Sequence, residues 1–130
     1  MNKILIDTNA YSHFLLGEPT ILDILGHAEV IYMSTFVLGE LLYGFKNGSK
    51  EKSNLVHLER FLAKGPVCLL NNSFKTAEFY AMIKINLKKM GRPIPINDVW
   101  IAAHTMESGS TLISRDQHFE AIAGLLFKSF

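Results

Sequence analysis

Short apolar runs alternate with longer amphipathic segments along this chain. Five runs are rich in β-branched and other apolar residues, as expected of buried strands: 3–7 (KILID), 29–33 (EVIYM), 66–70 (PVCLL), 111–114 (TLIS) and 125–130 (LLFKSF). Helical spacing occurs at 35–46, 50–64, 74–90 and 98–108, with shorter helices expected after Asp7, Pro19 and Arg115. This alternation indicates an α/β fold in one domain, 1–130, in which helices cover both faces of a parallel sheet.

Capping residues set the expected ends of the long helices. The predicted N-caps are hydroxyl and amide side chains that precede each helical segment: Ser34, Ser49, Ser73 and Asn97. Glycine follows each of the four segments, as is typical of helix C-termini. These helix ends leave no long linker between the predicted elements.

Asp7 closes the first apolar run, in the segment MNKILIDTNAY. In an open parallel sheet the carboxyl ends of the strands share one edge, and ligands bind there near the point where strand order reverses. Asp7 is therefore expected to face a binding crevice. The alternative is that Asp7 only N-caps a helix that begins near Thr8.

Glu40 lies in FVLGELLYGF, where every other position is apolar or glycine. A helix that is apolar on all sides is expected to be buried. An unpaired ionised carboxylate there would cost roughly several kcal/mol, or would take up a proton. The alternatives to a functional role are pairing with a structural Lys or Arg, or a position at the edge of the helix from which the carboxylate reaches water. Gly44, one turn away, would leave room for an ion or a substrate.

Asp98 and Asp116 are the other two candidate acids. Asp98 follows Asn97 at the start of a predicted helix, where an acid also complements the helix dipole. Asp116 follows the fourth predicted strand in TLISRDQHF and should lie on the same sheet edge as Asp7. Capping is the alternative role for both.

Clustered carboxylates repel one another unless protons or cations intervene. Oxygen ligands of this kind favour Mg²⁺ or Mn²⁺. A divalent cation at such a site would serve phosphoryl chemistry, because it activates water and stabilises charge on the attacked phosphate. The four acids therefore point to metal-dependent cleavage of phosphate esters.

Composition limits the partners and the cellular compartment that are expected for this chain. The chain has 130 residues, 48% of them hydrophobic, and a formal net charge of +1, so any nucleic-acid contact must come from a local patch. The single cysteine, Cys68, excludes a disulfide framework and suits the reducing cytoplasm. No run reaches the ~18 apolar residues of a membrane span, and the N-terminus does not read as a signal peptide.

The chain resembles the PIN-domain family, and more narrowly the VapC-type toxins of bacterial toxin–antitoxin pairs. The resemblance covers nearly the whole chain and rests on four segments: IDTN at 6–9, LGELLYG around Glu40, GRPIPINDVWIAA at 91–103 and SRDQHF at 114–119. It implies a three-layer α/β/α fold with sheet order 3-2-1-4-5. It also implies an endoribonuclease, a homodimer and a small antitoxin partner.

The resemblance also assigns roles to residues. It implies that Asp7, Glu40, Asp98 and Asp116 surround Mg²⁺ or Mn²⁺ at the catalytic site. Asp7 and Asp98 would be direct ligands, and Glu40 and Asp116 would bind through water or complete the charge. Asn9 and Ser114 would support the acids by hydrogen bonds. Asn9 follows the first Asp-Thr, and Ser114 stands where the family more commonly has Thr.

Structural rather than catalytic roles are expected for the other notable polar residues. Helical spacing places His104 away from Asp98, so a surface or core role is expected, and His118 is expected to pack beside Asp116 without a catalytic role. Four basic residues gather near one helix C-terminus: Lys84, Lys88, Lys89 and Arg92. Dipole complementation explains them, and an RNA-phosphate track toward Asp98 is the functional alternative.

Two other functions compete with RNA cleavage. A response-regulator receiver needs an aspartate after its third strand, where this chain has Asn71 and Asn72. A catalytically silent PIN fold that binds RNA or protein is the second, and the presence of all four acids argues against it. We expect a cytoplasmic metal-dependent ribonuclease with RNA as substrate.

Overall fold

The computed structural model describes residues 2–130 and contains a five-stranded sheet. The strands are β1 (Lys3–Ile6), β2 (Val30–Ser34), β3 (Val67–Leu70), β4 (Thr111–Ile113) and β5 (Phe127–Lys128). Their spatial order is β3-β2-β1-β4-β5, and every neighbouring pair is parallel. The predicted strands and the predicted order are confirmed.

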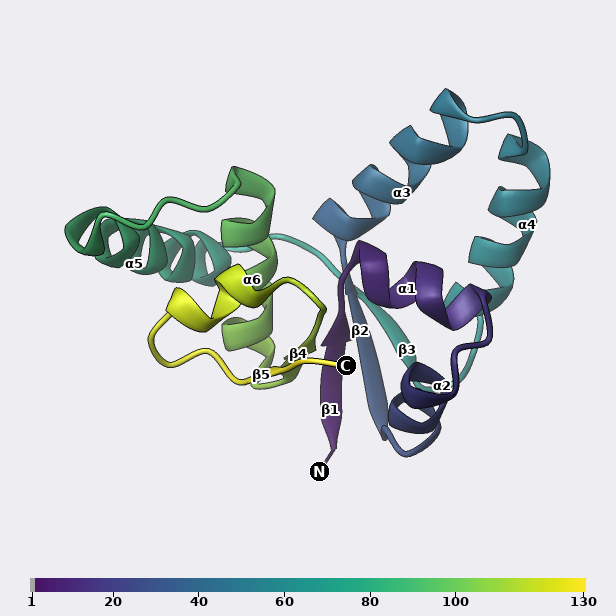
Figure 1. The fold of residues 1–130 in the computed structure, drawn as a ribbon, viewed down its shortest axis with the longest axis horizontal. Coiled ribbons are helices and arrows are strands. Elements are labelled where there is room, and N and C mark those ends of the chain that lie inside the picture. The colour runs from purple at the N-terminus through teal and green to yellow at the C-terminus, as the bar shows by residue number, and fades with distance from the viewer. Residues whose placement is uncertain (1) are drawn as a thin grey trace.

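Helices cover both faces of the sheet. They are α1 (Thr8–Leu15), α2 (Pro19–Gly26), α3 (Thr35–Asn47), α4 (Glu51–Leu62), α5 (Phe74–Met90) and α6 (Ile96–Ser108), with a 3₁₀ helix η1 (Gln117–Ala121). Figure 1 shows α1 to α4 on one side of β1 and α5, α6 and η1 on the other. This is the expected α/β/α arrangement, and its two sides follow from the direction in which successive strands are added.

Strand order reverses between β1 and β4, in the middle of the sheet. Ile6 at the end of β1 lies in register with Ile113 at the end of β4. The next residues, Asp7 and Ser114, therefore leave the sheet side by side at its carboxyl edge. This switch point is where ligands bind in open α/β sheets.

Two of the four predicted N-caps are confirmed. The Ser34 hydroxyl accepts from the backbone N–H of Phe36 at 3.1 Å, and Ser73 forms a capping box with Thr76 at the start of α5. The predicted caps Ser49 and Asn97 are wrong. Lys50 occupies the N-cap of α4, without a side-chain cap bond, so Ser49 lies one residue too early.

Helix α6 begins before Asn97, because Pro95 occupies its N-cap. The carbonyl of Pro95 accepts from the backbone N–H groups of Asp98 and Val99, at 3.0 and 3.2 Å. Asn97 and Asp98 therefore both lie inside the first turn, and neither side chain caps the helix. Asp98 is left available for other contacts.

Helix α3 is not buried on all sides, contrary to the expectation from its apolar sequence. Val37, Leu41 and Phe45 are buried, but the side chain of Tyr43 is 71% exposed and Gly39 also faces solvent. Glu40 is half-buried at the boundary between these two faces. Sequence hydrophobicity overstated burial here because α3 packs mainly against α1, α4, α6 and β2, which leave the face with Gly39 and Tyr43 uncovered.

Within residues 2–130, no helix combines the length and the apolar character needed to cross a membrane.

Candidate active site

Asp7 is buried at the end of β1, and both of its carboxylate oxygens accept hydrogen bonds. Oδ1 accepts from the backbone N–H of Ala10 at 2.9 Å, so Asp7 does N-cap α1. Oδ2 accepts from the hydroxyl of Ser114 across the switch point. Capping and a place at the sheet edge are therefore properties of the same carboxylate rather than alternatives.

Ser114 connects two of the predicted acids. Its buried hydroxyl donates to Asp7 and accepts from the backbone N–H of Asp116 at 3.0 Å. The bond to Asp116 fixes the chain as it turns out of β4 into η1. The predicted supporting position of Ser114 beside the acids matches this geometry.

Glu40 reaches the same region from α3. Its Oε1 accepts from the Thr8 hydroxyl at 2.8 Å, which joins the start of α1 to the middle of α3. Asn9 was expected to support the acids, but its side chain is exposed and no hydrogen bond joins it to an acid within the described chain. The role of Thr8 was not predicted from the sequence, although Thr8 is the residue of IDTN directly after Asp7.

Asp98 faces His118. Oδ2 of Asp98 lies 3.0 Å from Nε2 of His118, and the two side chains are 17% and 32% exposed. The predicted position of His118 beside Asp116 is confirmed, because ligand atoms of these two residues lie within 4.8 Å of each other. Its contact with Asp98 was not predicted. The only signal in the sequence was its position two residues after Asp116, which does not reveal a partner on α6.

The charges of the four acids act on one another. Burial is the main reason that the pKa of Asp98 is raised to about 6; His118 opposes the rise, and Glu40, Asp116 and Asp7 add to it. Burial also raises the pKa of Asp7, where the bonds from Ser114 and Ala10 oppose the rise and Asp116 and Glu40 add to it. The fold thus brings all four predicted acids into one electrostatically coupled cluster.

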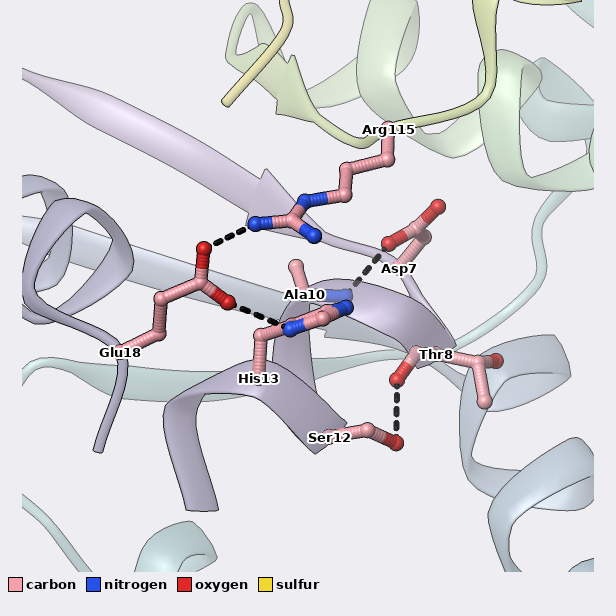
Figure 2. A network of polar contacts seen from close by, with 7 residues as sticks. All are labelled: Asp7, Thr8, Ala10, Ser12, His13, Glu18 and Arg115. Carbon is pink, nitrogen blue, oxygen red and sulfur yellow. Dashed lines mark hydrogen bonds and ion pairs between the residues drawn. The ribbon is translucent and has the colours of Figure 1, made fainter. Parts of the chain in front are cut away.

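Figure 2 shows a second network that holds the loop between Ser114 and Asp116. The guanidinium of Arg115, in this loop, pairs with Glu18, and Glu18 also pairs with Nδ1 of His13 on α1. The ring of Phe130 lies 4.7 Å from the Arg115 guanidinium. These contacts tie the loop to the α1–α2 connection and to the end of the chain.

The residues present fit a divalent cation. Ligand atoms of Asp98, Asp116 and His118 all lie within 4.8 Å of one another, and Asp7 and Glu40 lie outside this group of three. The donor set is mainly carboxylate oxygen, which suits Mg²⁺ and Mn²⁺, and one imidazole nitrogen also suits transition metals. Beyond the effect of burial, the charges of Glu40, Asp116 and Asp7 raise the pKa of Asp98, and a cation at this position would offset that repulsion.

His104 and the basic patch lie outside the cluster. His104 is fully buried; Nδ1 lies 2.8 Å from the Ser34 hydroxyl and Nε2 lies 2.8 Å from Oδ1 of Asn72. Of the two roles expected for it, surface or core, the structure shows the core role. Lys84 and Lys88 border a pocket formed by the end of α5 and the start of α6, the helix that carries Asp98.

Comparisons with known proteins agree with this geometry. The PIN domain family matches residues 4–125. The "Ribonuclease VapC2" of Haemophilus influenzae is 31% identical, and the "tRNA(fMet)-specific endonuclease VapC" of Shigella flexneri 26% identical, each with 96% of both chains covered. The crystal structure of VapBC2 from Rickettsia felis bound to promoter DNA contains a chain with a TM-score of 0.86 and 26% identity, and 98% of each chain is covered.

Proposed function

The chain belongs to the PIN-domain family, as a VapC ribonuclease toxin, and we propose that its four acids bind the divalent cation with which it cleaves RNA. The observation that carries this proposal is the convergence of Asp7, Glu40, Asp98 and Asp116 from four parts of the chain near the switch point. No stability requirement explains it, because assembling four carboxylates disfavours folding.

Mg²⁺ or Mn²⁺ is the proposed cation, and Asp98 and Asp116 are the best-placed ligands, with His118 beside them. When bound, such a cation lowers the pKa of a coordinated water and stabilises charge on the attacked phosphate. Asp7, for which the resemblance implied direct binding, lies outside the group of three, and here it completes the negative field around the cation together with Glu40. The number of water molecules that the cation retains determines whether each acid binds it directly or through water.

Asp7 is the proposed general base. Its carboxylate is buried and its pKa is raised, both of which favour acceptance of a proton from the attacking water. Ser114 and the N–H of Ala10 fix the orientation of that carboxylate. His118 favours the ionised form of Asp98, and Thr8 holds the carboxylate of Glu40 toward the cluster.

The proposed partners follow from the same charges. A small antitoxin is expected to place a basic side chain among the acids, since a cation there competes with the metal. The solved complex of the Rickettsia felis relative contains both VapB and VapC. We further propose that the chain acts as one domain, as a homodimer and in the cytoplasm, where the exposed thiol of Cys68 stays reduced.

Cleavage of RNA by the purified protein tests the proposal. The parent is incubated with total bacterial RNA in Mn²⁺, in Mg²⁺ and in chelator, beside Asp7→Asn. A matched control is Asp23→Asn, which removes an exposed acid on α2 that is not one of the four. We expect metal-dependent cleavage by the parent and the control only. A parent that binds RNA but leaves it intact in both metals would instead establish the catalytically silent alternative.

A further inference from the structure

A pocket of about 600 Å³ opens beside the candidate active site, between α3 and the first turn of α6. It is lined by Thr35, Phe36, Gly39, Glu40, Tyr43 and Asn97. Glu40 belongs both to this pocket and to the acid cluster, and Asn97 precedes Asp98 in the chain. A group bound in the pocket would therefore lie directly next to a phosphate held at the acids.

One wall of the pocket is aromatic. The ring of Phe36 is nearly parallel to that of Trp100, with 5.3 Å between centroids and 5° between planes. Trp100 stacks in turn on Tyr80, at 3.9 Å and 15°. Phe36 is the member of this stack that lines the pocket, and the largely exposed ring of Tyr43 stands on the same helix.

The remaining lining is polar and open. Asn97 is exposed, and its amide makes no hydrogen bond within residues 2–130. An amide presents one donor and one acceptor edge, the pattern that recognises the edge of a nucleobase. At Gly39 an added Cβ would meet no heavy atom within 4 Å, so the pocket is empty of protein above this residue.

We infer that this pocket takes one unstacked base of a single-stranded RNA, next to the phosphodiester that is cut. The inference rests on the proposed function for the position of the phosphate. Single-stranded RNA is recognised by stacking of splayed bases on aromatic rings and by hydrogen bonds to their edges. Phe36 and Tyr43 supply the rings, and Asn97 supplies the edge contact.

Positive charge lies at the far end of the same stack. Nζ of Lys84 lies 5.9 Å from the centroid of Tyr80, and Lys88 follows one turn later on α5. A strand whose base enters the pocket can therefore continue along Trp100 and Tyr80 toward lysines that neutralise its phosphates. This combination of flat rings, an amide and nearby cations favours a nucleic-acid strand over a protein side chain as the occupant.

Gly39→Leu is the sharpest test, since it fills the pocket from an open position. Gly44→Leu is its matched control. Gly44 is also exposed on α3, an added Cβ there also meets nothing within 4 Å, and it does not line the pocket. Both changes replace a helical glycine by a better helix former, so α3 stays folded.

Binding is measured in chelator by fluorescence anisotropy with labelled hexanucleotides of A, C and U, beside a short fully paired RNA duplex. We expect at least one hexanucleotide to bind the parent and Gly44→Leu equally and Gly39→Leu about tenfold or more weakly, the loss typical of one base–aromatic stack. The duplex should not distinguish the three proteins. Tyr43→Ala should weaken hexanucleotide binding, and Tyr43→Phe should restore it.

Equal hexanucleotide affinities of Gly39→Leu and Gly44→Leu would overturn the inference, as would the absence of hexanucleotide binding by the parent. The inference would also be overturned if Gly39→Leu bound RNA as the parent does but bound the antitoxin more weakly, because the pocket would then serve that protein. If Gly39 controls binding but the parent does not cleave RNA with Mn²⁺, the pocket stands and the nuclease proposal fails. If the parent cleaves RNA but Gly39→Leu and Gly44→Leu bind the hexanucleotide equally, the nuclease proposal stands and the pocket inference fails.

Discussion

Ser114 donates its hydroxyl hydrogen to Oδ2 of Asp7, although 107 positions separate the two residues in the chain. The hydroxyl oxygen of Ser114 in turn accepts from the backbone N–H of Asp116 at 3.0 Å. One hydroxyl thus sets the distance between the end of β1 and the loop after β4. Because it stabilises the ionised form, this bond lowers the pKa of Asp7 against the effect of burial.

Ser114→Ala should therefore weaken RNA cleavage most at low pH. Without the donor, the pKa of Asp7 rises further, and a larger fraction of Asp7 is protonated and unable to act as a base. Loss of such a supporting contact typically costs about 10- to 100-fold in activity. The measurement is the pH profile of kcat/KM, whose acid limb should move to higher pH. Ser114→Thr keeps the hydroxyl and should retain the parent profile; a profile for Ser114→Ala that is lower but unshifted would contradict this role.

Asp98→Asn should keep the fold and lower RNA cleavage by orders of magnitude, because one anionic group of the cluster is lost. Asp98 caps nothing and contacts His118 instead, so the amide does not disturb the start of α6. Circular dichroism and single-turnover cleavage with Mn²⁺ are measured together, beside Asp23→Asn. Cleavage within a few-fold of the parent would remove Asp98 from the catalytic site.

His118→Ala should lower cleavage more at pH 6 than at pH 8. The imidazole lies against Asp98 and opposes the rise in the pKa of that carboxyl to about 6. Without it, the Asp98 pKa rises further, so the carboxyl is protonated in mildly acidic solution but still ionised at pH 8. The measurement is the rate of RNA cleavage by the parent and by His118→Ala between pH 6 and pH 8. An equal loss at both pH values, with weaker Mn²⁺ binding, would mean that His118 acts as a ligand.

The strands and the four candidate acids could be predicted from local patterns, whereas the strand order was implied by the resemblance to the PIN-domain family. Each strand is a short apolar run, and Asp7 and Asp116 follow strands whose carboxyl ends must meet at one edge. The partners of the acids depend instead on side-chain directions across the chain. The Thr8–Glu40 and His118–Asp98 contacts join segments whose separation leaves no periodic signal.

Burial of α3 also could not be read from its residues. Apolar composition states what a helix is able to bury, and the neighbouring elements decide how much of it is covered. The exposed face with Gly39 and Tyr43 is part of the pocket next to Glu40, so the discrepancy marks a surface with a proposed function. Local rules fail most often at such sites.

Expression of this chain alone should arrest bacterial growth, and co-expression of its antitoxin should relieve the arrest. The physical reason is that a basic antitoxin side chain would pair with the acids and displace the cation. Growth curves after induction are compared for the parent, Asp98→Asn and Asp23→Asn. Normal growth of cells that contain soluble, catalytically active parent would contradict the toxin function.

The acid cluster should make the metal-free protein less stable as pH rises. Unfolded Asp titrates near its ordinary pKa of 3.8, whereas the pKa of Asp98 is about 6 in the folded protein and that of Asp7 is also raised. The folded state therefore binds more protons between these values, so this contribution to the free energy of unfolding is present at low pH and lost as pH passes through about 6. Mn²⁺ binds only the assembled, ionised site and should restore stability at neutral pH by RT ln(1 + [Mn²⁺]/Kd).

Asp7→Asn separates this effect from simple helix capping. The asparagine oxygen can still accept from the N–H of Ala10, so α1 remains capped, while one negative charge leaves the cluster. In chelator at neutral pH the variant should melt at a higher temperature than the parent, and Mn²⁺ should raise its melting temperature less; cleavage should be lost, as expected where function is kept at the expense of stability. The measurement is thermal melting of both proteins, each in chelator and in excess Mn²⁺. Four coincident melting curves would show that Asp7 is only a cap and that the acids hold no cation.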